Sequence, residues 1–135
     1  MLFSFPKNER LCGAINVARL FNDGSAMVNF PLRTVFLFEK NENCEVKILI
    51  SVPKKKFKRA NRRNRIKRLI RESYRLNNSE LKNALASRNL SLTLAIHYIS
   101  AEMPDFEKIS ETVKQIFEEL ILKISENENI TPNNQ

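Results

Sequence analysis

A dense run of cationic side chains, RRNRIKRLIRESYR over residues 62–75, contains the most informative chemistry of this sequence. Arginine and lysine bind phosphate groups, and arginine also forms planar, bidentate hydrogen bonds to phosphates and base edges. The wider segment 54–75 holds twelve of the chain's 23 basic residues and a single acid, Glu72, whereas the rest of the chain has eleven basic and fourteen acidic residues. This asymmetry predicts a polyanion-binding face, and nucleic acid is the favoured partner.

Apolar residues interrupt the cationic run at the spacing of a helix. Ile66, Leu69, Ile70 and Tyr74, together with Ser73, fall on one stripe of an amphipathic helix. At about 100° per residue, the opposite side carries Asn64, Arg68, Arg71 and Arg75, with Arg65 and Lys67 beside them. The spacing therefore predicts a helix that is attached to the protein by one face and presents cations on the other.

The elements that must position this helix are those of a single small α/β domain. The patterns predict a helix over about residues 9–22 that ends near Gly24, strands over 31–40 and 44–52 joined as a hairpin across Asn41 to Asn43, a strand over 91–100 and a helix over about 105–124. The order is α-β-β-α-β-α around a mostly antiparallel sheet. The basic helix is then a crossover between the second and third strands, fixed to the sheet at both ends.

Length and composition limit the other possibilities. A chain of 135 residues with 42% hydrophobic residues suits one domain, expected over 1–124, with a flexible polar tail over 125–135. No signal peptide or membrane span is recognised, so a cytoplasmic protein is expected. Cys12 and Cys44 lack the spacing of a zinc site, and His97 is expected to be a strand residue with a local hydrogen bond. No set of side chains is arranged for unaided phosphodiester hydrolysis.

The ordered run from Ala60 to Arg75 closely resembles the signature of the bacterial ribonuclease P protein subunit. That signature is Arg-Asn-Arg, then Lys-Arg, then Arg-Glu followed by an aromatic residue. Flanking residues are similar as well, and they include Arg10-Leu11, Leu20-Phe21, Gly24 and Ser51-Val52-Pro53-Lys54-Lys55. The resemblance covers about residues 8–122, and its specific part is 51–75.

This resemblance implies an α/β domain with an unusual left-handed βαβ crossover, since right-handed crossovers are the general rule. It also implies that the protein is a subunit of an endoribonuclease whose catalyst is an RNA. In that family the RNA subunit holds most of the Mg²⁺ and removes the 5′ leader of precursor tRNA. The protein binds both the RNA subunit and the leader, and neither a membrane nor a small-molecule cofactor is implied.

Matching the motif position by position implies two sets of site residues. The contacts to the RNA subunit would be Arg63, Asn64, Arg65, Lys67, Arg68, Arg71 and Arg75. The cleft for the single-stranded leader would contain Phe21, Phe36, Ser51 and Lys55, with the rings stacking on bases. No residue is implied to be catalytic or to bind a metal.

Two other interpretations of the same residues stay open. From their pattern alone, Phe21, Phe36 and Phe38 would be core aromatics. The basic helix would also suit a ribosomal or ribosome-assembly RNA-binding protein. A helix lying on a membrane surface is less favoured, because Ile66, Leu69 and Ile70 are needed to attach the crossover to the sheet.

Overall fold

Seven regular elements follow a short helical turn at residues 20–23 in the computed structural model, which describes residues 20–40 and 44–126. They are β1 (Ser25–Asn29), β2 (Leu32–Lys40), β3 (Val46–Ser51), α2 (Ala60–Asn77), α3 (Ser79–Arg88), β4 (Leu90–Tyr98) and α4 (Phe106–Glu126). The single α/β domain that the sequence predicts is confirmed. Most of the helix expected over 9–22, and the tail beyond residue 126, lie outside the described residues.

The four strands form one mixed sheet in the order β1-β2-β4-β3. The β1–β2 and β2–β4 pairs are antiparallel, and β3 pairs with β4 in parallel. The hairpin predicted between 31–40 and 44–52 is therefore wrong, because β4 lies between these two strands. The physical reason is burial: Leu94, Ala95 and Ile96 of β4 are all buried, so this strand needs a neighbour on each side and packing on both faces.

The parallel β3–β4 pair requires a crossover, and α2 and α3 together supply it. The predicted crossover position of the basic helix is confirmed, while its left-handed sense stays a prediction. Two elements were not predicted. Helix α3 buries only Leu81 and Leu85, and no residue of edge strand β1 is buried. Neither element therefore carries a strong hydrophobic period.

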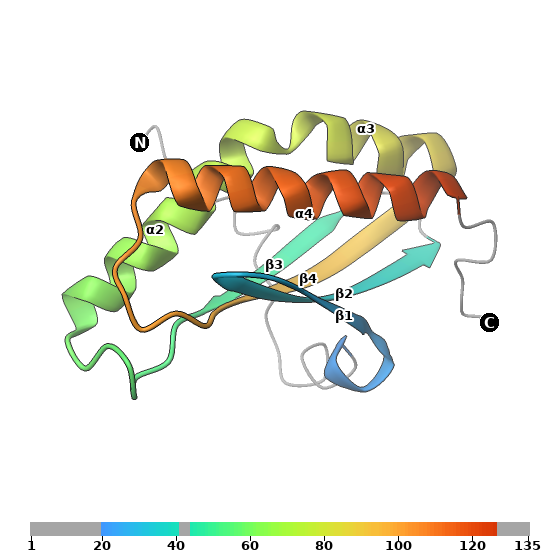
Figure 1. Ribbon diagram of the computed structural model, residues 1–135. Coiled ribbons are helices and arrows are strands. Elements are labelled where there is room, and N and C mark those ends of the chain that lie inside the picture. Colours follow the sequence, from blue (N-terminus) through green and yellow to red (C-terminus); the bar gives the residue numbers. More distant parts are fainter. Residues whose placement is uncertain (1–19, 41–43, 127–135) are drawn as a thin grey trace.

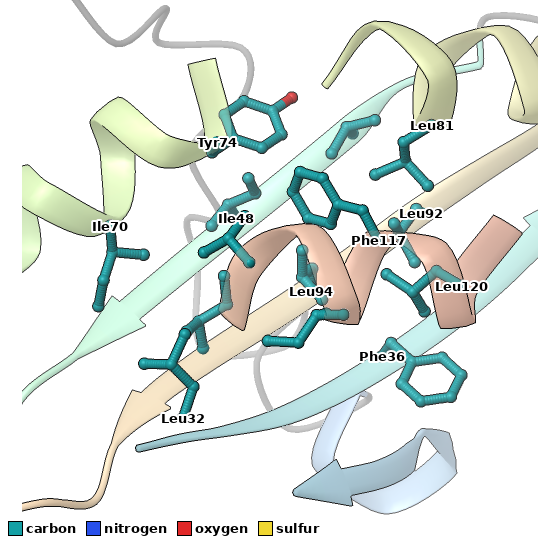
Figure 2. Packing of buried hydrophobic residues seen from close by; sticks show 14 of the residues in the cluster. Leu32, Phe36, Ile48, Ile70, Tyr74, Leu81, Leu92, Leu94, Phe117 and Leu120 are labelled. Carbon is teal, nitrogen blue, oxygen red and sulfur yellow. The ribbon is translucent and has the colours of Figure 1, made fainter. Parts of the chain in front are cut away.

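Helices α2, α3 and α4 cover one face of the sheet, and the helical turn at 20–23 lies on the other (Figure 1). Between the three helices and the sheet lies the main core (Figure 2). Its members include Ile70 and Tyr74 of α2, Leu81 of α3, Phe117 and Leu120 of α4, and Ile48, Leu92, Leu94 and Phe36 of the strands. None of the helices in the described residues has both the length and the apolar content needed to cross a bilayer.

Strand β2 alternates between the two faces, and this alternation decides which side chains can reach the site. Leu32, Phe36 and Phe38 belong to the core under the helices, whereas Val35 packs with Leu20 on the opposite face. Side chains of β2 with even numbers thus face the helices.

The helical turn at 20–23 approaches β2 very closely at Gly24. The Gly24 amide donates a hydrogen bond to the Leu20 carbonyl at 2.8 Å, which ends the helix where the sequence predicts. A Cβ atom at Gly24 would lie 2.5 Å from the Leu20 carbonyl oxygen and 2.8 Å from that of Phe36. Both neighbours are backbone atoms, so this contact requires a residue without a side chain.

Candidate nucleic-acid interface

Helix α2 is attached to the domain by the apolar stripe that the sequence predicts. Ile66, Ile70, Ser73 and Tyr74 are buried, and Leu69 packs against the same core while remaining partly exposed. The Tyr74 ring meets Phe117 of α4 edge-on, with ring centroids 5.9 Å apart. Packing against α4, α3 and β3 therefore holds α2 in a fixed orientation.

The opposite side of α2 carries the predicted row of polar residues. Asn64, Arg68, Arg71 and Arg75 are all exposed, and we call these four residues the cation ridge. Arg65 beside them is exposed and Lys67 is half-buried. Among the described residues, no side-chain hydrogen bond or ion pair engages Asn64, Arg65 or Arg68. Asn64, Arg65 and Arg68 are thus available to an anionic partner.

The two ends of this helix use their arginines differently. Arg63 is half-buried, and its Nη1 donates hydrogen bonds to the carbonyls of Phe57 at 2.8 Å and Lys58 at 3.1 Å. It therefore holds the β3–α2 loop in addition to offering a charge. At the other end, Arg75 forms an ion pair with Glu72, with 3.0 Å between Nη2 and Oε2. The hydrogen bond to Glu72 raises the pKa of Arg75, and the pair partly neutralises this end of the ridge.

The β3–α2 loop, residues 52–59, adds further cations next to the start of α2. Buried Phe57 anchors it against Tyr98, with ring centroids 5.8 Å apart. Lys54, Lys55 and Lys58 are exposed. The loop and the N-terminal end of α2 lie at the same end of the sheet (Figure 1). Their charges extend the cationic surface from the helix toward the strand ends.

A pocket of about 330 Å³ lies on the sheet face opposite α2, and we call it the sheet pocket. Its lining comes from the helical turn and from three strands: Phe21, Arg33, Val35, Leu49, Ser51, Ala95 and His97. The strand residues form two rows across β2, β4 and β3. One row is polar, Arg33-His97-Ser51, and the next is apolar, Val35-Ala95-Leu49. Phe21, which is 52% exposed, closes the pocket from the helical turn.

The structure brings together only part of the predicted leader cleft. Phe21 and Ser51 both line the sheet pocket. Lys55 is exposed on the β3–α2 loop and does not line it. Phe36 is only 6% exposed and lies on the helix-covered face, where Lys123 Nζ of α4 is 5.9 Å from its ring centroid. Placing Phe36 in the same cleft is therefore wrong, and the core interpretation is correct for Phe36 and Phe38.

Sequence reasoning missed most of the residues that line the sheet pocket. Arg33, Val35, Leu49 and Ala95 received no role, and His97 was expected only to form a local hydrogen bond. Strand alternation could have found Leu49, because residues separated by an even number of positions from Ser51 share its face on β3. The register that places Arg33 and His97 in the same row depends on the strand order, which the sequence did not predict.

His97 occupies the centre of the polar row. Its Nδ1 and the Ser51 hydroxyl oxygen are 2.5 Å apart, so the expected local hydrogen bond is confirmed. Partial burial lowers the pKa of His97, and the positive charges of Arg33 and Lys56 lower it further. This lowering favours the neutral form of the ring near pH 7. The described residues include no group of three or more His, Cys, Asp or Glu side chains able to hold a metal ion.

Comparison with known proteins agrees with these observations. The sequence matches the profile of the family described as Ribonuclease P over residues 5–121. It is 38% identical over 126 residues to the ribonuclease P protein component of Porphyromonas gingivalis, covering 93% of this chain and 89% of the relative. The corresponding component of Geotalea uraniireducens is 32% identical over 118 residues, covering 87% of this chain and 96% of the relative.

Solved structures share the fold. The RNase P protein of Staphylococcus aureus superposes with a TM-score of 0.63 at 23% identity, covering 89% of this chain and 97% of that protein. The protein from Thermotoga maritima gives a TM-score of 0.65 at 22% identity, covering 82% and 96%. Since the family profile spans most of the sequence and relatives above 30% identity align over nearly all of it, this chain belongs to the ribonuclease P protein family.

Proposed function

We propose that this chain is the protein subunit of ribonuclease P, which binds the catalytic RNA subunit and the 5′ leader of precursor tRNA and assists Mg²⁺-dependent removal of that leader. The observation that carries the proposal is the cation ridge on a helix whose other face is locked into the core. A cationic tail would bind any polyanion, whereas a fixed row of side chains favours a folded RNA of matching shape.

The cation ridge and its neighbours are the proposed contacts to the RNA subunit. Arg65, Arg68 and Arg71 supply charge for phosphates, and Asn64 can both donate and accept hydrogen bonds. Lys67, half-buried beside the ridge, adds a point charge. Arg63 and Arg75 contribute less directly, because Arg63 also binds loop carbonyls and Arg75 is paired with Glu72.

The sheet pocket is the proposed site of the leader. Its apolar row and the exposed Phe21 ring offer a surface on which a base can stack, and Arg33 at the rim can contact a phosphate. The β3–α2 loop begins just after Ser51 and ends at α2, so its lysines, Lys55 among them, connect the two proposed surfaces. A leader in the pocket and an RNA on the ridge would therefore share one continuous cationic border.

The proposal assigns Mg²⁺ mainly to the RNA subunit and the chemistry of cleavage to the RNA. The contribution of this chain is to neutralise phosphates and to position RNA, which lowers the Mg²⁺ concentration that the RNA needs. Its relatives are named ribonuclease P protein components, which supports a role for this chain as one component of that enzyme.

The test is cleavage of precursor tRNA by the RNA subunit at low Mg²⁺, with and without this chain. We expect the chain to restore cleavage at the mature 5′ end and to have no activity by itself. Failure to restore cleavage would contradict the proposed function and would favour a ribosomal or assembly role. Cleavage by the chain without RNA would contradict the assignment of catalysis to the RNA.

A further inference from the structure

The hydrogen bond between Ser51 and His97 fixes the imidazole ring at the rim of the sheet pocket. Its Nδ1 is engaged by the Ser51 hydroxyl at 2.5 Å, so Nε2 is the ring nitrogen left for a ligand. His97 also lies between Arg33 and Ser51 in the same row of the sheet. The two neighbouring strands hold its backbone and Ser51 holds its ring, so both have a defined position relative to the pocket.

The charge state of this ring suits recognition of a base edge. Within residues 20–40 and 44–126, the polar groups that face His97 are Arg33 from β2, Ser51 from β3 and Lys56 from the loop, and none of these three is acidic. A neutral imidazole offers a single donor or acceptor at Nε2, set by the tautomer that Ser51 selects. Arg33 and Lys56 already supply positive charge for phosphates. His97 therefore adds directional hydrogen bonding rather than another cation.

The apolar row next to His97 supplies the second half of a base-binding site. Val35 and Ala95 are buried, and Leu49 is half-buried behind the pocket. A base stacked on these residues and on Phe21 would leave its polar edge toward the row that contains His97. Stacking tolerates every base, so discrimination among bases has to come from a hydrogen bond at the edge.

We propose that His97 is a specificity-determining residue for the 5′ leader, an inference that rests on the proposed function. Its Nε2 hydrogen-bonds the edge of the leader base that stacks on the apolar row and Phe21. Base identity at one leader position is thereby recognised by a neutral side chain rather than by one of the cations.

The experiment uses the holoenzyme reconstituted from the full chain and the RNA subunit. Dissociation constants are measured for precursor tRNAs that differ at one leader nucleotide at a time, with mature tRNA as the leader-free reference. We expect the unaltered chain to discriminate among bases at one leader position. His97→Phe keeps a planar ring without Nε2, and it should reduce that discrimination by about 3- to 10-fold, the worth of one hydrogen bond. Affinity for mature tRNA should stay the same.

Three further variants separate recognition from packing. His97→Gln places an amide near the position of Nε2 and should keep part of the discrimination. Ser51→Ala removes the partner that orients the ring and should lose discrimination even if His97→Phe does not fold. Thr93→Ala is the matched control. Thr93 lies on the same face of β4 as His97 and pairs with Leu37 of β2, but it lies outside the sheet pocket. It should behave like the unaltered chain.

Three results would overturn the role of His97. They are the absence of any base preference in the unaltered holoenzyme, equal discrimination by the unaltered chain and a folded His97→Phe, and an equal loss of affinity for precursor and mature tRNA. If the unaltered chain does not support cleavage by the RNA subunit at all, the proposed function itself fails. The first reconstitution separates that outcome from a failure at His97 alone.

Discussion

At the scale of single residues, His97 gives a direct probe of the sheet pocket, because it is the only histidine in the sequence. We expect an NMR titration of its ring protons to give a pKa below the ordinary value of 6.5, owing first to burial and then to Arg33 and Lys56. Arg33→Gln should raise that pKa, since one positive charge is removed. Arg88→Gln is the control, because Arg88 instead bonds the Ser125 carbonyl. An unchanged pKa of His97 in Arg33→Gln would contradict the arrangement of the polar row.

Gly24 is the residue that sets how closely the helical turn approaches β2. Replacing it with alanine puts Cβ within 2.8 Å of two carbonyl oxygens, those of Leu20 and Phe36, so backbone must move. We expect Gly24→Ala to lower the free energy of unfolding by about 1–3 kcal/mol, the usual cost of overpacking. Urea unfolding measures this, with Ser25→Ala at the neighbouring exposed position as the control. Equal stability of the two variants would refute the tight contact.

At the scale of elements, helix α2 has a buried attachment face and an exposed cationic face, so the proposed function predicts that RNA binding and stability can be changed independently. Reversing charge with Arg68→Glu and Arg71→Glu should weaken binding to the RNA subunit by about 100-fold or more at moderate salt. The melting temperature should change little, because both residues are exposed. Binding is measured by filter retention and folding by thermal unfolding.

The matched control for this reversal lies on α4. Lys108→Glu with Lys114→Glu makes the same change in net charge at two exposed positions away from the cation ridge. Comparable losses of RNA binding from the two double variants would show that net charge matters more than position. A collapse of the melting temperature in the α2 variant would show that its buried face has been misplaced.

The elements themselves were predictable where a local period was strong. The 3.6-residue pattern of α2 correctly assigned Ile66, Ile70 and Tyr74 to the core and Arg68 to solvent. The strands expected over 31–40, 44–52 and 91–100 correspond to β2, β3 and β4 with shifts of at most two residues at their ends. The helix expected over 105–124 is α4, which continues to Glu126.

Pairing between elements could not be predicted in the same way. Three residues between two strands favour a hairpin locally, but the fold places β4 between β2 and β3 because its buried side chains require the central position. The error with Phe36 has a similar cause. An aromatic residue on the first long strand was recognised, but which face it occupies depends on the register, and position 36 faces the helices.

At the scale of the whole molecule, the two proposed binding surfaces lie on opposite faces of one sheet. The cation ridge lies on the helical layer and the sheet pocket on the other face, with the β3–α2 loop running between them. The ridge would act through charge, whereas the pocket combines an apolar row with a histidine whose pKa is lowered. The two surfaces should therefore respond differently to ionic strength.

This difference can be measured through the salt dependence of holoenzyme assembly and of precursor tRNA binding. The logarithm of the affinity for the RNA subunit should fall linearly with the logarithm of salt concentration, and each ridge contact removed, as in Arg68→Gln, should make the slope shallower by about 0.7–0.9 per phosphate. His97→Phe should lower discrimination among leaders without changing the slope for precursor tRNA, because a neutral hydrogen bond releases no counterion. Arg33→Gln, which removes a cation from the same pocket, is its paired control and should change that slope. If His97→Phe and Arg33→Gln altered the slope equally, His97 would be acting as a cation, and the separation of charge from base recognition would be wrong.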